Sequence, residues 1–196
     1  MSSAEDPRRL AWAYLSRVAQ GPHRALADYA EKAGPEETCA AVAGGELGDR
    51  LLVRSHIDTA AADLEVITSL GGRLVTPDDE EWPVWQLLSF DGAGMSDGAD
   101  QCAPLALWVL GGTPLTELLE RAVAIVGTRA ASAYGEHVTA EIAGDLAIDG
   151  WTVISGAAFG IDAAAHRAAL GVGARTMAVL ACGVDRAYPS GHARLL

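Results

Sequence analysis

The stretch from Val153 to His166 reads VISGAAFGIDAAAH. Its apolar start is typical of a short buried strand, and its alanine-rich end is typical of a helix. Between the two, Ser155-Gly156 and Gly160 leave the backbone bare. Two explanations are open at this point. A strand-to-helix turn needs glycine, or a ligand comes so close to the backbone that a side chain would block it.

The same alternation continues on both sides of this stretch. AVAIVGT (122–128) and TMAVLACG (176–183) predict two more apolar strands, and SAYGEHVTAEIAGDLAIDG (132–150) predicts a helix with Ser132 as its N-cap and Gly150 at its end. A further helix is expected over 161–173. Strands alternating with helices predict a βαβαβ unit, with right-handed crossovers and a parallel sheet that helices cover on both faces.

The upstream part of the chain has a different organisation. Residues 6–70 predict four or five short helices with Gly and Pro at the joints. RLVTPDD (73–79) predicts a strand and a turn, EEWPVWQLL a short helix or an extended segment, 89–103 a surface loop, and LALWVLGG (105–112) a buried strand. We therefore predict an α/β fold preceded by a small all-helical domain, with residues 1–71 and 72–196 as the two domains.

Charge is distributed unevenly along the chain. The 26 acids and 14 basic residues give a net charge of −12, which argues against an overall electrostatic preference for nucleic acid. From Arg121 onward, however, six arginines balance six acids. The whole acid excess thus lies in residues 1–120, and the C-terminal part can hold a local positive site.

Nothing in the sequence points to a membrane or to a metal. The longest apolar runs fall short of the roughly 20 residues of a membrane span, and the N-terminus lacks a signal-type apolar region. A cytoplasmic protein is the expectation. The cysteines are odd in number and far apart, without CxxC or HExxH patterns, so we expect neither disulfides nor zinc but small, partly buried side chains at Cys39, Cys102 and Cys182.

The predicted strands end at one edge of the sheet, where ligands bind in open α/β folds. Three turns are expected there, namely Gly127-Thr128-Arg129, Ser155-Gly156 and Cys182-Gly183. Two of these turns lead into helix N-termini, whose free N–H groups and positive dipole end attract anions. Arg129 adds a fixed positive charge that the turn itself does not need. Together these features favour a ligand that carries phosphate.

Three further side chains near the second turn have two interpretations each. Asp162 is more often an N-cap or a first-turn acid of a helix than a catalytic carboxylate, and His166 more often packs or caps locally. Phe159 is favoured as a packing residue, with stacking on a nucleobase as the alternative.

Several classes of site lack their motifs in this sequence. GTRAAS is not GxGxxG, and no acid follows the second strand to hold a ribose, which argues against NAD. GxxxxGK[ST] and GxSxG are absent, which argues against P-loop and hydrolase chemistry. No carboxylate pair has catalytic spacing. The sequence therefore favours binding over catalysis, with no cofactor.

Taken together, these segments resemble the DNA-processing protein A family, also called DprA or Smf. The resemblance rests on VGTR in AIVGTRAASAYG, on SGxxxGIDxxAH in VISGAAFGIDAAAHRAAL and on GxDxxYP in TMAVLACGVDRAYP. VTPDDEEWPVWQLL and LALWVLGG also look like the segment that precedes this core in the family. The resemblance covers most of the chain.

The resemblance implies a Rossmann-like domain that binds single-stranded DNA, protects incoming strands in natural transformation and helps load the recombinase RecA. It implies homodimers and no established catalysis. Arg129 would contact backbone phosphate, and the Ser155-Gly156 turn would line the same pocket, with Asp162 and His166 holding that turn and its helix. The implied DNA-binding set is Gly127, Thr128, Arg129, Ser155, Gly156, Phe159 and Gly183.

Two departures from the family pattern bear on this expectation. Many relatives have a basic residue where this chain has Phe159, so stacking would replace a phosphate contact. Relatives also continue through the second half of the Rossmann-like domain, and the chain is therefore expected to be truncated. Two rival hypotheses stay open: a Rossmann-like nucleotide hydrolase of the phosphoribohydrolase type, and a non-functional remnant.

Overall fold

The structure, a computed structural model, describes residues 6–90 and 102–196, and the chain divides into two compact units. The N-terminal unit comprises Met1–Gly112 and the C-terminal unit Thr113–Leu196. The first strand pair thus belongs to the same compact unit as the helices. The division into domains at residues 71 and 72 stays a prediction.

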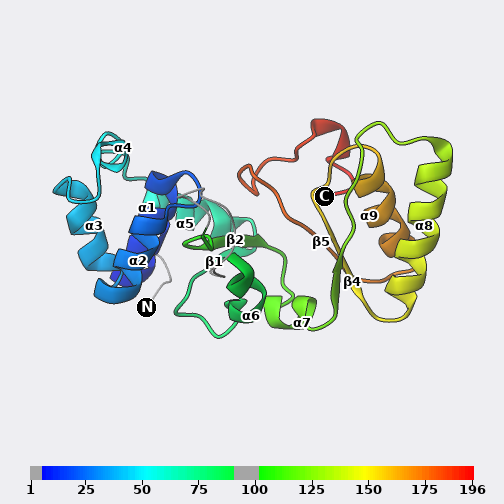
Figure 1. The fold of residues 1–196 in the computed structure, drawn as a ribbon, viewed down its shortest axis with the longest axis horizontal. Coiled ribbons are helices and arrows are strands. Elements are labelled where there is room, and N and C mark those ends of the chain that lie inside the picture. Colours follow the sequence, from blue (N-terminus) through cyan, green and yellow to red (C-terminus); the bar gives the residue numbers. More distant parts are fainter. Residues whose placement is uncertain (1–5, 91–101) are drawn as a thin grey trace. The chain divides into compact units, whose positions relative to one another are not determined.

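Five helices open the N-terminal unit, as the spacing of apolar residues and of Gly and Pro predicts. They are α1 (Pro7–Ala19), α2 (Arg24–Ala33), α3 (Pro35–Ala43), α4 (Asp49–Leu52) and α5 (Ala60–Ser69) (Figure 1). Asp6 caps α1 by accepting a hydrogen bond from the backbone N–H of Arg8 at 3.1 Å. Gly34 ends α2 and starts α3. Its φ of +86° is a backbone conformation that residues with a side chain rarely adopt.

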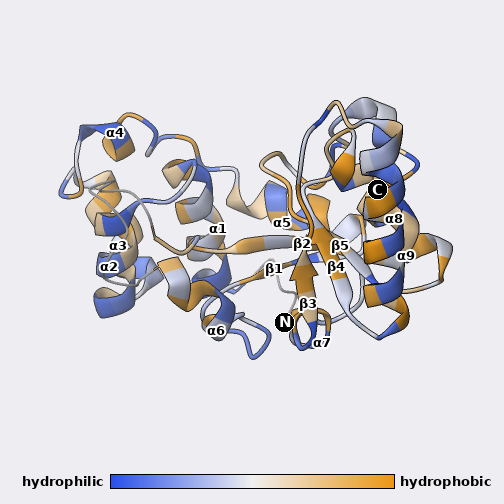
Figure 2. Cartoon of the chain, turned by 45° about the vertical axis from the view of Figure 1, so that its right-hand side comes forward, coloured by the Kyte–Doolittle hydropathy of each residue, from blue (hydrophilic) through white to orange (hydrophobic). Residues whose placement is uncertain are grey.

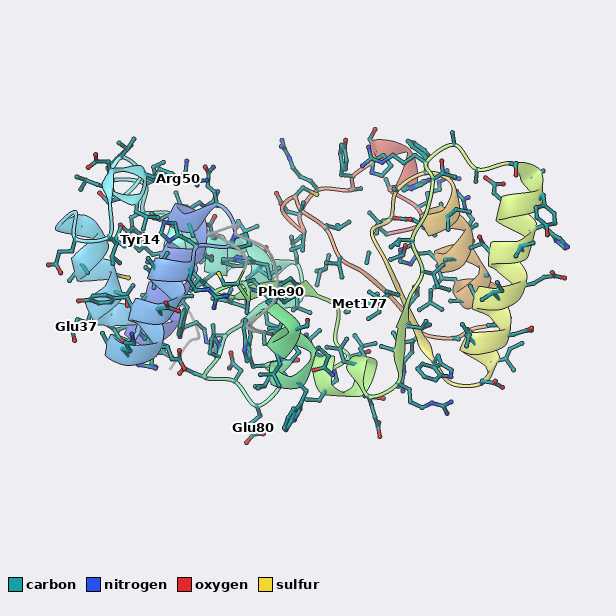
Figure 3. The ribbon with its side chains drawn as sticks, viewed as in Figure 1. Tyr14, Glu37, Arg50, Glu80, Phe90 and Met177 are labelled. Atoms are coloured by element: carbon teal, nitrogen blue, oxygen red, sulfur yellow. The ribbon has the colours of Figure 1, made fainter. Side chains whose placement is uncertain are left out.

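Helix α1 is the centre of the N-terminal core. Its side chains Leu15 and Val18 are almost fully buried, together with Leu26 of α2, Val42 of α3 and Leu64 of α5. Tyr14, labelled in Figure 3, lies on the same helix and donates from its hydroxyl to the carbonyl of Ser55 at 2.8 Å. Full burial of a leucine or valine side chain contributes roughly 1.5–3 kcal/mol to the free energy of folding.

Two short strands complete the part of the N-terminal unit that the structure describes. Strand β1 (Gly72–Val75) pairs antiparallel with β2 (Leu107–Leu110), and α6 (Val84–Leu87) and the 3-10 helix η2 (Leu88–Phe90) lie between them in the chain. The prediction of a buried strand over 105–112 is wrong in its burial, because β2 is only half-buried along most of its length. Most of the loop predicted over 89–103 lies outside the described residues.

Charged side chains join α1 to the turn after β1. The Arg8 guanidinium donates to both carboxylate oxygens of Asp78 at 2.8 Å, and Trp12 Nε1 donates to the same carboxylate at 2.6 Å. Arg8 is the main cause that holds the pKa of Asp78 below its usual value, and Trp12 adds to this effect. Arg9 donates to Asp79 at 2.7 Å.

The C-terminal unit is the predicted βαβαβ unit. After the short helix α7 (Leu115–Leu119) come β3 (Ala122–Ala124), α8 (Ala133–Ile148), β4 (Thr152–Ser155), α9 (Ile161–Gly171), β5 (Thr176–Ala178) and the 3-10 helix η3 (Ser190–His192). The strands are parallel in the order β3-β4-β5. Val153 lies opposite Val123 on one side and Thr176 on the other. Ser132 is the N-cap of α8, as predicted, and accepts from Gly135 N at 3.1 Å.

The outer strands end earlier than the sequence predicts. β3 ends at Ala124 instead of near residue 128, and β5 ends at Ala178 instead of residue 183. One more backbone bond extends each ladder, from Ile125 N to Ile154 O and from Val179 N to Ser155 O, both at 2.9 Å. The strands end there because β4 lies between them and turns away at Gly156.

Both helices of the βαβαβ unit lie on the same side of the sheet (Figure 1). They bury a small core of Ala143, Ala147, Val153, Ala165 and Ala169. Because side chains alternate along a strand, the opposite face carries Ile154 and Met177 (Figure 3). Beyond the strand ends, Val126 and Val179 are 71% and 60% exposed.

The expectation of a sheet that helices cover on both faces is therefore wrong for the described residues of the C-terminal unit. Crossovers of one hand that advance in one direction across the sheet place every helix on one face. The strands stand out as apolar in the hydropathy colouring of Figure 2. Among the helices of the described residues, none has both the length and the apolar character that crossing a membrane requires.

Candidate functional site

The turn Gly127-Thr128-Arg129, called the VGTR turn below, is in direct contact with the start of α9, the helix that follows the Ser155-Gly156 turn. The backbone N–H of Ile161, at the start of α9, donates to the carbonyl of Thr128 at 3.2 Å. The VGTR turn therefore lies against the N-terminus of the helix that follows the second turn. This contact brings Gly127, Thr128 and Arg129 beside the positive end of α9.

Two glycines make the contact between the turns possible. Gly160 has φ of +74° and ψ of −125°, and a Cβ there would overlap the carbonyl oxygen of Thr128 and lie 2.9 Å from the carbonyl carbon of Arg129. A Cβ at Gly127 would lie 2.7 Å from Cγ1 of Ile161. Close packing within the chain, against backbone at Gly160 and against the Ile161 side chain at Gly127, explains these two glycines without a ligand.

Arg129 is an exposed cation at this edge. Its side chain has neither an ion pair nor a hydrogen bond among the described residues, although most other arginines of the chain are bound to carboxylates or carbonyls. The neighbouring Thr128 hydroxyl accepts from the N–H of Ala130 at 3.2 Å and so stabilises the turn that carries Arg129. Such a guanidinium is always charged and carries several N–H donors, so it is suited to bind an anion.

The Ser155-Gly156 turn is occupied by a carboxylate of the chain itself. Asp162 is buried, and its Oδ2 accepts from the N–H of Gly156 at 3.1 Å and from the N–H of Ala158 at 3.3 Å. A Cβ at Gly156 would lie 3.0 Å from this oxygen. Asp162 is confirmed as a first-turn acid of α9, but the alternative that it is the N-cap is wrong, because Gly160 takes that position.

Ser155 is turned into the fold. It is 3% exposed, and its hydroxyl donates to the carbonyl of Ile125 at 2.6 Å. The small residues of this turn thus leave room for the contact with Asp162, while the Ser155 hydroxyl joins β4 to the end of β3. A phosphate at this edge has to bind beside the Asp162 carboxylate, near Arg129 and the first residues of α9.

His166 packs locally, as favoured from the sequence. Its Nδ1 lies 2.6 Å from the hydroxyl of Thr176, and that hydroxyl donates to the carbonyl of Val153 at 2.7 Å. Nδ1 must therefore carry the proton. Nε2 is buried and has no hydrogen-bond partner among the described residues. Burial lowers the pKa of His166, against a smaller opposing effect of Asp162.

This burial predicts a loss of stability in mild acid. The unfolded chain takes up a proton at His166 below about pH 6.5, while the folded chain resists it, so stability present above that pH is lost as pH falls through the lowered pKa. The contribution is at most about 1.4 kcal/mol per pH unit.

The variant His166→Asn keeps an N–H near the Thr176 hydroxyl but cannot be charged. We expect its urea midpoint to fall less than that of the wild type between pH 7.5 and pH 5.5. His137→Asn, an exposed histidine on α8, is the control. Equal losses in His166→Asn and in the wild type would contradict the assignment.

Phe159 and Gly183 have different surroundings. Phe159 is 51% exposed, and its ring meets the ring of His192 edge-on, with the centroids 4.6 Å apart. His192 is buried and was not singled out from the sequence, since no motif joins residues 33 positions apart. Gly183 lies in the coil after β5, where its carbonyl accepts from Arg186 N at 3.1 Å, so it does not end a strand.

None of Cys39, Cys102 and Cys182 is in a disulfide, and all three side chains are buried or half-buried. Burial raises the pKa of the Cys39 thiol to about 12. Within residues 6–90 and 102–196, no cluster of three His, Cys, Asp or Glu side chains is placed to hold a metal ion.

Comparison with known proteins gives consistent matches. The profile of the family described as DNA recombination-mediator protein A matches residues 73–196. A protein named DprA from Mycobacterium tuberculosis is 51% identical over 195 residues, which cover 97% of this chain and 50% of that protein. Protein Smf of a Synechocystis strain is 30% identical over 214 residues, which cover 100% of this chain and 48% of that protein.

The chain spans about half the length of these curated relatives. A similar fold is found in the crystal structure of DNA processing protein A from Streptococcus pneumoniae. That structure matches with a TM-score of 0.64 at 24% identity, over 100% of this chain and 63% of the other. The likeness supports the α/β fold with a helical N-terminal region.

Proposed function

This chain belongs to the DNA processing protein A (DprA/Smf) family, and from this premise we propose that it binds single-stranded DNA through the edge of the sheet that carries Arg129. The observation that carries the proposal is the exposed guanidinium on a turn locked against the N-terminus of α9. A cation and a helix N-terminus at one place favour a phosphate group.

The distribution of charge supports the proposal. The chain is acidic overall, but the acid excess lies in residues 1–120, and from Arg121 onward the charges cancel. A phosphate near Arg129 therefore meets less repulsion than the net charge suggests. Phosphate contacts provide affinity without sequence preference, which suits a protein that coats strands of any sequence.

The half-exposed ring of Phe159 adds a second kind of contact. Phe159 follows the turn that Asp162 holds. It directly precedes Gly160, the residue that packs against the VGTR turn. Stacking on a base is tolerant of sequence, because every base has an aromatic face. We propose Arg129 for the phosphate and Phe159 for the base, with Gly127, Thr128, Ser155 and Gly156 shaping the edge.

The test is fluorescence anisotropy of a labelled dT 20-mer with the full chain at several salt concentrations. We expect Arg129→Ala to weaken binding about tenfold and to lower the slope of log affinity against log salt by about one. Arg167→Ala is the matched control, because it removes an exposed arginine from α9 in the same unit. Equal losses in the two variants would show that charge alone is responsible and would contradict the site.

The wider role follows from the same family. We propose that the chain acts in the cytoplasm on strands taken up during transformation, that it protects them and assists loading of RecA, and that the family homodimer is its working form. These roles rest on relatives about twice as long as this chain. Binding, not catalysis, is the proposed activity.

A further inference from the structure

A segment near the C-terminus lies against the turn that carries Phe159. His192, in η3, donates from Nδ1 to the carbonyl of Ala157 at 2.9 Å, and both residues are buried. A carbonyl only accepts hydrogen bonds, so Nδ1 of His192 carries a proton. The segment and the turn are 35 residues apart in the chain, and this hydrogen bond joins them.

The carbonyl that His192 holds belongs to an unusual backbone position. Ala157 has φ of +56°, in the left-handed region that alanine avoids, and it is fully buried. A residue in this region persists only where surrounding contacts hold it. The His192 hydrogen bond and the Asp162 bonds to Gly156 N and Ala158 N hold the turn from two sides.

The same segment contacts the ring of Phe159. The His192 ring meets it edge-on at 4.6 Å and 61°, a favourable arrangement for two aromatic rings. Gly191 lies so close that an added Cβ would be 3.3 Å from Cζ of Phe159. One side of the Phe159 ring is therefore held by η3, and about half of the side chain stays exposed.

A ring that is already held loses less freedom when a ligand stacks on it. We propose that His192 is a positioning residue that orients Phe159 for stacking on a base of single-stranded DNA. The inference rests on the proposed function and deepens it, because it separates the contact with the base from the contact with phosphate. His192 itself is buried and does not touch the DNA.

The experiment compares two labelled probes with the full chain, a dT 20-mer and an abasic 20-mer with the same phosphates. Phosphate contacts act on both probes, and stacking acts on dT alone. We expect the wild type to prefer dT by about tenfold, the size of one base stacked on an aromatic ring. Phe159→Ala is expected to remove most of this preference, and Arg129→Ala to weaken both probes alike.

His192→Ala is expected to reduce the dT preference to the level of Phe159→Ala, and the double variant to reduce it no further. Gly191→Ala leaves His192 in place but presses on the Phe159 ring, and it is expected to lower the same preference. If His192→Ala does not melt cooperatively, and so is not properly folded, Gly191→Ala still tests whether η3 positions the Phe159 ring. His137→Ala, an exposed histidine on α8, is the control and is expected to leave both affinities unchanged.

The outcomes separate this inference from the function on which it rests. A folded wild-type chain that binds neither probe overturns both. A wild type that binds dT and the abasic probe equally overturns the role of Phe159 and His192 but leaves DNA binding intact. A folded His192→Ala or Gly191→Ala chain that keeps the full dT preference overturns the positioning role, as does an equal loss on both probes.

Discussion

Replacing Gly160 by alanine is expected to destabilise the C-terminal unit by about 3 kcal/mol or more. Two penalties add at this residue. The backbone has φ of +74° and ψ of −125°, which is close to a glycine-only region, and the new Cβ would overlap the carbonyl oxygen of Thr128. The overlap involves backbone on both sides, so neither partner relieves it by a change of rotamer.

Hydrogen exchange of β4 and α9 measures this effect within the C-terminal unit. The matched control is Gly173→Ala, at a residue with φ of +70° and no atom within 4 Å of the added Cβ. The control is expected to cost about 1 kcal/mol, from the backbone conformation alone. Equal protection in the two variants would contradict the close packing of the two turns.

Removing the carboxylate of Asp162 is the second large effect that we expect. The variant Asp162→Ala leaves the N–H groups of Gly156 and Ala158 without their acceptor. Hydrogen bonds to a charged group contribute about 1.5–3 kcal/mol, and buried N–H groups without a partner cost more than exposed ones. We expect a loss of about 2–3 kcal/mol in the free energy of unfolding.

Urea unfolding followed by circular dichroism measures the loss. Asp145→Ala, which removes an exposed carboxylate from α8, is the control and is expected to change stability by less than about 0.5 kcal/mol. A wild-type midpoint for Asp162→Ala would mean that water replaces the carboxylate at the turn. The assignment of Asp162 as the residue that shapes this turn would then be wrong.

The features that the sequence predicts correctly are local ones. The βαβαβ order follows from apolar runs that alternate with helical spacing, and Ser132 follows from the preference for serine at helix starts. The five N-terminal helices follow in the same way, because Gly and Pro punctuate them. In each case the residues that determine the element lie within a few positions of one another.

The features that it misses depend on contacts between distant residues. The strand ends at Ala124 and Ala178 depend on where β4 turns away, and the half-burial of β2 depends on what packs against it. The bare Ser155-Gly156 turn suggested an external phosphate, but the nearest anion is the carboxylate of Asp162. His192 has no local signal at all, because its partner is 35 residues away.

The strand order of the C-terminal unit also has a consequence for the rate of folding. In the order β3-β4-β5, each strand pairs with the next strand in the sequence, and one helix with its connections lies between the two in the chain. The chain therefore closes only loops of modest length, and the entropic cost of each closure is small. These loops are still longer than the one that closes a hairpin, so the parallel sheet is expected to form more slowly than the helices that cover it. During synthesis, each new strand finds its partner already formed, so the sheet can grow in the direction in which the ribosome releases the chain.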